Sequence, residues 1–227
     1  MLIAVLLIVG VLILSELVAV GLLYRSVGSH KRFWQTEAQK PGEYTYVALG
    51  DSAAQGVGAL NPQNGYVGLL GKQLREKTGK TVRTVNLSES GARIQDVLQN
   101  QIPQLKRLKP DLVTIEIGAN DIASFDRKKF EEQFTILVNL LPDGTYVSNM
   151  PYFGSRASRR QNAFEASRII EKILRNQNRL VLVDLQSITE ERDSLRNYAA
   201  DYFHPNSRAY KNWAEAFWLA IEPRLKL

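Results

Sequence analysis

The chain begins with an almost unbroken run of apolar residues, from residue 2 to residue 23. About 20 such residues are enough to cross a bilayer as a helix. Glu16 is the only charged residue within the run, no Lys or Arg precedes it, and no clear small-x-small cleavage site follows it. These features favour an uncleaved anchor over a signal peptide. We therefore expect a single-pass transmembrane helix over residues 1–24.

A polar, mixed stretch over residues 25–43 follows the apolar run and ends in Lys40-Pro41-Gly42. Pro and Gly in succession are typical of loops, so this stretch is expected to be a linker.

The first basic residues after the run would favour a cytoplasmic position for this side of the helix. Because they are few, the side of the membrane is left open.

From residue 44 onward, short apolar runs rich in β-branched residues alternate with longer segments that repeat apolar residues every three or four positions. Runs of the first kind predict strands, and segments of the second kind predict amphipathic helices. The expected strands cover about 44–49, 81–87, 111–117, 145–149 and 180–185. The expected helices cover about 66–78, 93–107, 127–141 and 157–177, and a last one follows Asn206.

Two polar or rigid residues refine these helices. Pro103 is expected to kink or divide the helix over 93–107, and Asn206 is expected to cap the last helix.

Strands that alternate with helices form parallel βαβ units. The pattern therefore predicts an α/β domain over residues 44–227, a three-layer αβα sandwich around about five parallel strands.

The amino-acid composition excludes several kinds of catalytic and metal-binding chemistry for this chain. The 227 residues include no Cys, which excludes disulfides, thiolate catalysis and Cys-based zinc sites. His30 and His204 are the only histidines, so a multi-histidine metal site is not available, and we expect neither a metal nor a cofactor. The net charge of +6 suits ordinary solubility, although it would also favour an anionic membrane surface. The arginines are scattered, and we expect no nucleic-acid partner.

Ser52 lies just after the first expected strand, and Gly50 and Asp51 form a sharp turn between the two. Ligands of open α/β sheets bind at the carboxyl edge of the strands, where this serine would lie. The residues that follow are small and would leave room for a substrate to approach the backbone. We interpret Ser52 as a nucleophile.

Other polar or flexible residues should reach the same edge of the sheet. Gly91 and Asn120 follow the second and third expected strands, and strand-to-helix loops of a parallel sheet share one edge. His204 can act as the base that a serine hydroxyl needs. Asp201, three residues earlier, can orient the imidazole. The backbone N–H groups of Ser52 and Gly91 and the amide of Asn120 can serve as three donors to an oxyanion.

These residues occur in blocks that resemble the four signature blocks of the SGNH (GDSL-type) hydrolases, in the same order and at plausible spacing. The resemblance covers about residues 44–221. The blocks are Gly50-Asp51-Ser52, the turn at Gly91, Gly118-Ala119-Asn120-Asp121 and Asp201-x-x-His204-Pro205.

The resemblance implies a flavodoxin-like αβα fold and a metal-free serine esterase or lipase. It implies Ser52 as nucleophile, His204 as base and Asp201 as its orienting acid, with Ser52, Gly91 and Asn120 in the oxyanion hole. Taken singly, a serine after a strand, a turn glycine, a capping asparagine and a loop histidine are each common. Their joint occurrence in register favours the catalytic interpretation.

The substrate is narrowed only to a class. Aromatic and basic residues between Met150 and Arg160 could contact an acyl chain or an anionic head group, or could simply be a solvated helix start. We expect a small-molecule, glycan or lipid ester with a short acyl group, a thioester or an O-acetyl group. The alternatives are an acyltransferase on the same scaffold and a catalytically silent, membrane-tethered binding domain. The oligomeric state is left open.

Overall fold

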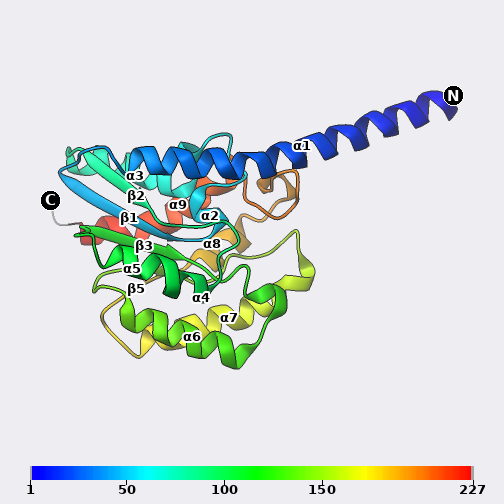
Figure 1. Cartoon of the computed structure of the whole chain (residues 1–227). Helices are drawn as coiled ribbons and strands as arrows, with labels where there is room; N and C mark the ends of the chain where they lie inside the picture. The colour runs from blue at the N-terminus through cyan, green and yellow to red at the C-terminus, as the bar shows by residue number, and fades with distance from the viewer. Residues whose placement is uncertain (1, 226–227) are drawn as a thin grey trace.

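The computed structural model describes residues 2–225, including the side chains of residues 9–11 and 13–225. Residue 1 of the expected anchor and residues 226–227 of the expected domain lie outside the described residues. Within the described part, five strands form one parallel sheet in the order β2-β1-β3-β4-β5 (Figure 1). They are β1 Tyr44–Gly50, β2 Val82–Asn86, β3 Leu112–Glu116, β4 Tyr146–Ser148 and β5 Val181–Val183. The expected α/β class is confirmed, and the strand order is that of flavodoxin-like folds.

Helices cover both faces of the sheet, as expected for a three-layer sandwich (Figure 1). One face is covered by α1 Leu2–Glu37, α3 Tyr66–Thr78, α8 Leu185–Glu191 and α9 Ser207–Ile221. The other face is covered by α4 Ile94–Asp96, α5 Ile102–Leu105, α6 Arg127–Leu140 and α7 Ala157–Arg175. The short helix α2 Ser52–Gln55 follows β1, and single 3₁₀ turns occur at Pro62–Asn64, Ile122–Ser124, Leu195–Asn197 and Glu222–Arg224.

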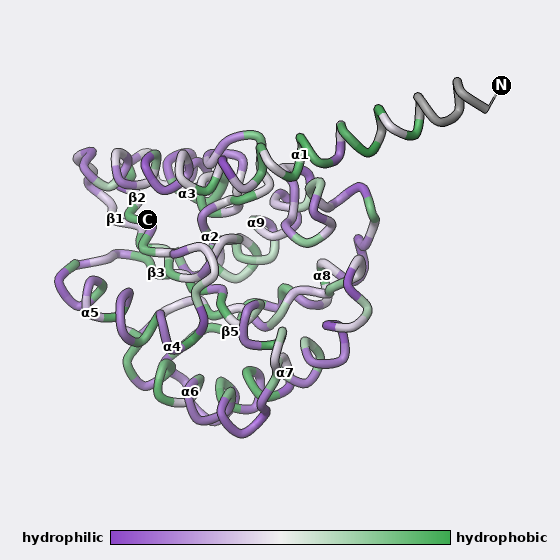
Figure 2. The backbone as a smooth tube through the Cα atoms, turned by 45° about the vertical axis from the view of Figure 1, so that its right-hand side comes forward, coloured by the Kyte–Doolittle hydropathy of each residue, from purple (hydrophilic) through white to green (hydrophobic). Residues whose placement is uncertain are grey.

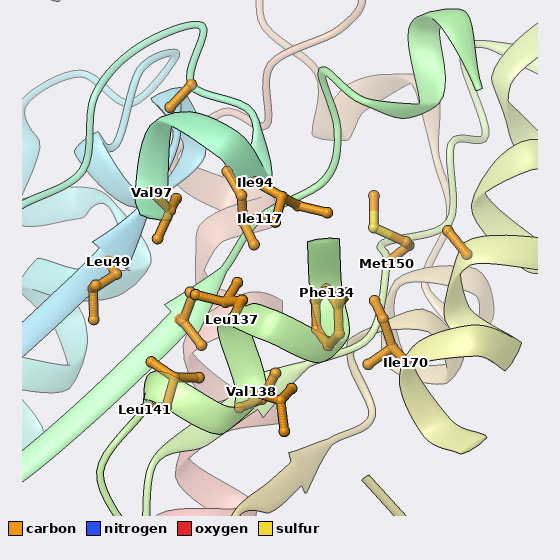
Figure 3. Close-up of a cluster of buried hydrophobic side chains, with 14 of the residues drawn as sticks. Leu49, Ile94, Val97, Ile117, Phe134, Leu137, Val138, Leu141, Met150 and Ile170 are labelled. Atoms are coloured by element: carbon orange, nitrogen blue, oxygen red, sulfur yellow. The ribbon is translucent and has the colours of Figure 1, made fainter. Parts of the chain in front are cut away.

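Each face of the sheet has its own apolar core, because the side chains of the central strand β1 alternate between them. Val47 and Leu49 belong to the core under α4–α7, whereas Tyr46 and Ala48 belong to the core under α3 and α9. A parallel strand covered on both faces is expected to be apolar throughout. In the first core, Phe134 stacks on Phe130 at a centroid distance of 5.8 Å and lies near Met150 and Ile170 (Figure 3). These two cores hold the strand ends that carry the polar loops.

The helix expected over residues 93–107 is helical but not uniform. Its middle, Val97–Gln101, is a π-helix, and Pro103 lies in the first turn of α5. Because Pro has no N–H and its ring crowds the preceding turn, a wider turn before it relieves the conflict. The buried side chain of Gln101 then bonds the backbone of Gly50 in both directions, at 3.0 and 2.8 Å. This helix therefore fastens the end of β1.

The segment expected to be a linker differs from that expectation. α1 continues without a break to Glu37 (Figure 1). Leu23, His30 and Trp34 are buried against the domain, and Trp34 donates from Nε1 to the carbonyl oxygen of Gln55 at 2.9 Å. Burial of this one face stabilises a helix that the polar composition of residues 25–37 does not suggest.

The N-terminal part of α1 projects from the domain and is apolar (Figure 2). Among the described residues, one helix is long and apolar enough to cross a membrane, over Val9–Glu37. A signal sequence near an N-terminus passes the same test of length and composition. The boundaries of the anchor, linker and hydrolase domain remain predictions.

Candidate active site

Ser52 is the first residue of α2, directly beyond the end of β1. Gly50 has φ of +145°, and a Cβ there would lie 2.2 Å from the carbonyl oxygen of Glu116, so this position requires glycine. Asp51 caps α2, because its Oδ1 accepts from the N–H of Ala53 at 2.9 Å. The turn thereby presents Ser52 at the carboxyl edge of the sheet.

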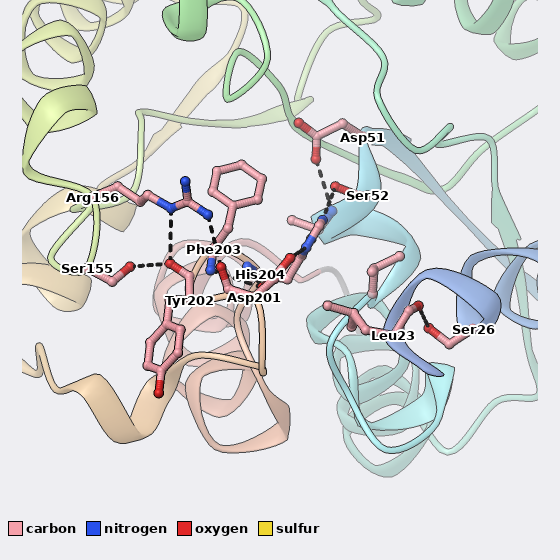
Figure 4. A network of polar contacts seen from close by, with 12 residues as sticks. Leu23, Ser26, Asp51, Ser52, Ser155, Arg156, Asp201, Tyr202, Phe203 and His204 are labelled. Carbon is pink, nitrogen blue, oxygen red and sulfur yellow. Dashed lines mark hydrogen bonds and ion pairs between the residues drawn. The ribbon is translucent and has the colours of Figure 1, made fainter. Parts of the chain in front are cut away.

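The structure brings Ser52, His204 and Asp201 together in a chain of hydrogen bonds (Figure 4). Nε2 of His204 lies 2.9 Å from Oγ of Ser52. Nδ1 of His204 lies 2.6 Å from Oδ2 of Asp201. The other carboxylate oxygen of Asp201 accepts from the backbone N–H groups of Phe203 and His204, each at 3.0 Å. The carboxylate is thus held by the same turn that carries the imidazole.

The charge on Asp201 is set by opposing effects. Burial acts to raise the pKa of its carboxyl, but the hydrogen bond and charge of His204, together with the two backbone N–H groups, hold that pKa below its ordinary value. An ionised Asp201 accepts the Nδ1 proton of His204. The lone pair of Nε2 then faces the hydroxyl of Ser52, which is the arrangement a general base needs.

Two backbone N–H groups near Ser52 are free to act as donors. Among the residues that the structure describes, neither the N–H of Ser52 nor that of Gly91 donates a hydrogen bond. Gly91 has φ of +82° and open space around its Cα, so its backbone conformation, not crowding by the protein, requires glycine. Gln55 of α2 holds this loop by donating to the carbonyl of Ser88 at 2.9 Å and accepting from Ser90 at 2.6 Å.

Asn120 reaches the same turn but its amide is already engaged. Its Nδ2 donates to the carbonyl oxygen of Ala92 at 2.9 Å and to Oδ2 of Asp51 at 3.3 Å. The longer of these bonds is the weaker one. The structure therefore places Asn120 beside the nucleophile's turn, and an oxyanion would have to compete with Asp51 for its proton.

Two buried carboxyls lie near the nucleophile: Asp51 directly precedes Ser52, and Glu116 is the last residue of β3. Burial raises the pKa of Asp51 to about 6, while the N–H of Ala53 and the charge of His204 act in the opposite direction. Burial, followed by the charge of Asp51, raises the pKa of Glu116 well above its ordinary value. Both oxygens of Glu116 are without a hydrogen-bond partner among the described residues. The uncharged form of Glu116 is therefore favoured.

Arg156, one of the basic residues expected near the cleft between Met150 and Arg160, bonds the backbone of the loop that carries Asp201, a contact that the sequence did not indicate. Its guanidinium donates to the carbonyl oxygens of Asp201 at 2.9 Å and Tyr202 at 3.3 Å (Figure 4). Arg159 lies 4.7 Å from the ring centroid of Phe203, whose ring in turn meets His204 edge-on at 4.9 Å. Hydrogen bonds to backbone carbonyls depend on the fold, and no local sequence signal marks them.

No group of three or more His, Cys, Asp or Glu side chains in the described part of the chain could hold a metal ion. The candidate site contains a hydroxyl, an imidazole, carboxylates and amide donors. Such a set is suited to acyl transfer through a serine nucleophile.

Several solved structures share this fold. An α/β hydrolase named LAE5, from the metagenome of Lake Arreo in Spain, matches with a TM-score of 0.67 and 21% identity over 83% of this chain and all of its own. Axe2, an acetylxylan esterase from Geobacillus stearothermophilus, matches with a TM-score of 0.61 and 22% identity over 79% of this chain and 94% of its own. TesA matches with a TM-score of 0.65 and 24% identity over 80% of this chain and 99% of its own.

No curated protein matches the chain. Residues 48–211, more than half of the sequence, match the profile of the GDSL-like Lipase/Acylhydrolase family. The match includes every residue of the candidate site. The chain belongs to the GDSL-like lipase/acylhydrolase family and is a hydrolase of the esterase or lipase kind.

Proposed function

We propose that the chain hydrolyses carboxylic esters through a Ser52–His204–Asp201 triad and an acyl-enzyme intermediate. One observation carries this proposal: the continuous hydrogen-bonded path from Oγ of Ser52 through both ring nitrogens of His204 to Asp201, with distances of 2.9 and 2.6 Å. The same geometry activates serine in other hydrolases.

The first half-reaction acylates Ser52. His204 takes the hydroxyl proton on Nε2 while Oγ attacks the carbonyl carbon of the ester, and Asp201 stabilises the imidazolium that forms. The N–H groups of Ser52 and Gly91 receive the oxyanion, and Asn120 becomes the third donor when it releases its 3.3 Å bond to Asp51. His204 then gives its proton to the departing alcohol or thiol, which leaves an acyl-Ser52 ester.

The second half-reaction returns the free enzyme. Water takes the place of the leaving group, His204 removes its proton, and the hydroxide equivalent attacks the acyl carbon. The second tetrahedral intermediate uses the same three donors, and the imidazolium returns the proton to Oγ of Ser52. Water in this step makes the enzyme a hydrolase, whereas an acceptor alcohol would make it an acyltransferase.

For the substrate we propose a short-acyl ester, a thioester or an O-acetyl group. The small residues around the nucleophile and the acetylxylan esterase named among the similar structures support a small acyl group. We place the hydrolase domain at 44–227 and the anchor at 1–24, with α1 crossing the membrane once. The length and apolar character of the projecting part of α1 support the anchor.

The test uses the full chain in detergent with p-nitrophenyl acetate and p-nitrophenyl butyrate. Steady turnover is expected, and Ser52→Ala should lower kcat by about 10⁴- to 10⁶-fold. Ser29→Ala is the matched control, because Ser29 is an exposed serine of α1 that donates to the carbonyl of Ser26 at 2.7 Å. If the Ser52→Ala protein were as active as the wild type, Ser52 would not be the nucleophile. Product analysis with an added alcohol separates hydrolysis from acyl transfer.

A further inference from the structure

The point at which α1 leaves the domain lies at the catalytic end of the sheet. Leu23 is the most N-terminal of the apolar residues described as buried, and the helix packs against α2, which carries Ser52. Figure 4 shows Leu23 and Ser26 on one side of the triad and Tyr202 on the other. Before Leu23 most of the described apolar side chains of α1 are exposed, among them Leu17 at 65% and Leu22 at 61%.

The loop that carries Asp201 extends beyond this point, along the projecting helix. Residues of α1 and of the loop over residues 195–202 line one hollow of about 390 Å³. The residues of α1 in this hollow are Ser15, Glu16 and Ala19. At a rise of about 1.5 Å per residue, these positions lie roughly 5 to 10 Å beyond Leu22 along the helix. The loop is therefore level with part of the apolar run.

Apolar side chains are exposed on the loops around His204. Leu60 is 89% exposed, and it follows Gly58, whose Cα packs against His204 and Pro205. Leu195 is 67% exposed at the start of the other loop. In a lipid interface these side chains would leave water, which is favourable for apolar surface.

Tyr202 is also directed outward, by an unusual backbone. It is 51% exposed and has φ of +49°, which is a strained conformation for a bulky residue. Ser155 and Arg156 hold its carbonyl oxygen at 2.7 and 3.3 Å, and the ring points away from the triad (Figure 4). Tyr rings with an apolar body and a polar tip are enriched at membrane interfaces.

Building on the proposed anchor and esterase function, we propose that Leu60, Leu195 and Tyr202 dip into the membrane interface beside α1, and that the site cleaves esters of amphiphiles resident in that membrane. Residues 2–22 make about 30 Å of helix, which matches the thickness of the hydrocarbon layer. The loop then reaches the depth of about 5–10 Å at which interfacial segments lie. Glu16, the one charge in the run, faces the hollow lined by the loop, which reduces its cost in lipid.

The experiment compares two acetate esters of glycerol with the full chain reconstituted in phosphatidylcholine vesicles. One is triacetin, which is soluble, and the other is 1,2-dioleyl-ether-3-acetylglycerol, which resides in the bilayer and has a single ester bond. Leu60→Ser and Leu195→Ser should each lower the ratio of lipid-acetate to triacetin turnover at least fivefold. Leu219→Ser is the matched control, because Leu219 is 60% exposed but lies near the far end of α9.

An unchanged ratio in both loop variants, or no wild-type turnover of the lipid acetate while triacetin is hydrolysed, overturns the membrane-interface proposal and leaves the esterase function standing. Absence of turnover of both esters, with Ser52→Ala equal to wild type, instead overturns the proposed function. Circular dichroism melting of each variant shows that a changed ratio does not arise from unfolding.

Discussion

Oγ of Ser52 lies 2.9 Å from Nε2 of His204, although 152 positions separate the two residues in the sequence. Ser52 is placed by the end of β1, and His204 by the turn before α9. The two segments are locked together because Gly58 packs against the backbone of Pro205 and Tyr210 donates to the carbonyl of Val57 at 2.6 Å. The pair is thus fixed by contacts between the segments that follow each of the two residues.

Asp201→Asn should reduce kcat by about 10³- to 10⁴-fold while the protein remains folded. The side-chain oxygen of Asn can still accept from the N–H groups of Phe203 and His204, which preserves the turn. The amide NH₂ then faces Nδ1 of His204, favours the opposite tautomer and removes the base. Steady-state kinetics with p-nitrophenyl acetate measure the effect.

The control for this substitution is Asp143→Asn, because the Asp143 side chain is 80% exposed and pairs with Arg179 at the surface. Its kcat should remain within twofold of the wild type. Retention of full activity by Asp201→Asn would show that His204 is oriented by other groups.

Asn120→Ala should lower kcat by about 10²-fold and change KM little, because an oxyanion donor acts only once the tetrahedral intermediate forms. A purely structural role, through the bonds to Asp51 and Ala92, would instead lower thermal stability and leave the kcat of the folded protein unchanged. Kinetics and melting curves measured on the same sample separate the two. Asn100→Ala, at an exposed position, is the control.

Glu116→Gln should stabilise the protein increasingly as the pH rises. Burial raises the pKa values of Glu116 and Asp51 in the folded state, to about 6 for Asp51. At a pH above the ordinary pKa of a carboxyl, unfolding of the protein therefore releases protons from these two groups. Their contribution is fully present at about pH 4 and below, and is lost as the pH rises through the folded-state pKa values. Each such proton costs about 1.4 kcal/mol per pH unit within that window.

Urea denaturation of wild type and Glu116→Gln at pH 5 and pH 8 measures this difference. The free energy of unfolding of the variant minus that of the wild type should increase by about 1 kcal/mol or more per pH unit within the window. A difference that stays constant with pH would mean that Glu116 is ionised in the folded protein. Glu132→Gln, on the exposed side of α6, controls for loss of a surface charge.

Trp34→Ala should destabilise the full chain by about 3–5 kcal/mol, because it leaves a cavity and removes the bond to the carbonyl of Gln55. Tyr24→Ala lies on the same helix but is 63% exposed, and should cost under about 0.5 kcal/mol. Equal stability of the two variants in denaturation experiments would show that α1 is not docked on the domain.

The sheet could be predicted from sequence because its strands are short, apolar and separated by clear helical periodicity. α3 begins and ends where the pattern predicts, at Tyr66 and Thr78, and Asn206 caps α9 by accepting from Arg208 and Ala209. The predicted triad residues are also those that the structure brings together. Glycines and polar residues at the ends of parallel strands share one edge whatever the details of packing.

Other features could not be predicted because they depend on contacts between distant residues. Residues 25–37 look like a polar linker, and their helix is explained by the burial of His30 and Trp34 against the domain. The role of Arg156 requires the carbonyls of Asp201 and Tyr202 to lie within reach, which no local pattern encodes. The engagement of Asn120 with Asp51 likewise appears only once the two turns are in place.

The central claim is that Ser52 is an activated nucleophile, and a fluorophosphonate probe tests it most directly, because the probe reacts covalently with such a serine. After incubation of the full chain, mass spectrometry of the peptides should find the adduct on Ser52, and His204→Ala should slow its formation by orders of magnitude. An adduct on another residue, or no adduct on Ser52 in a preparation that hydrolyses esters, would contradict the account.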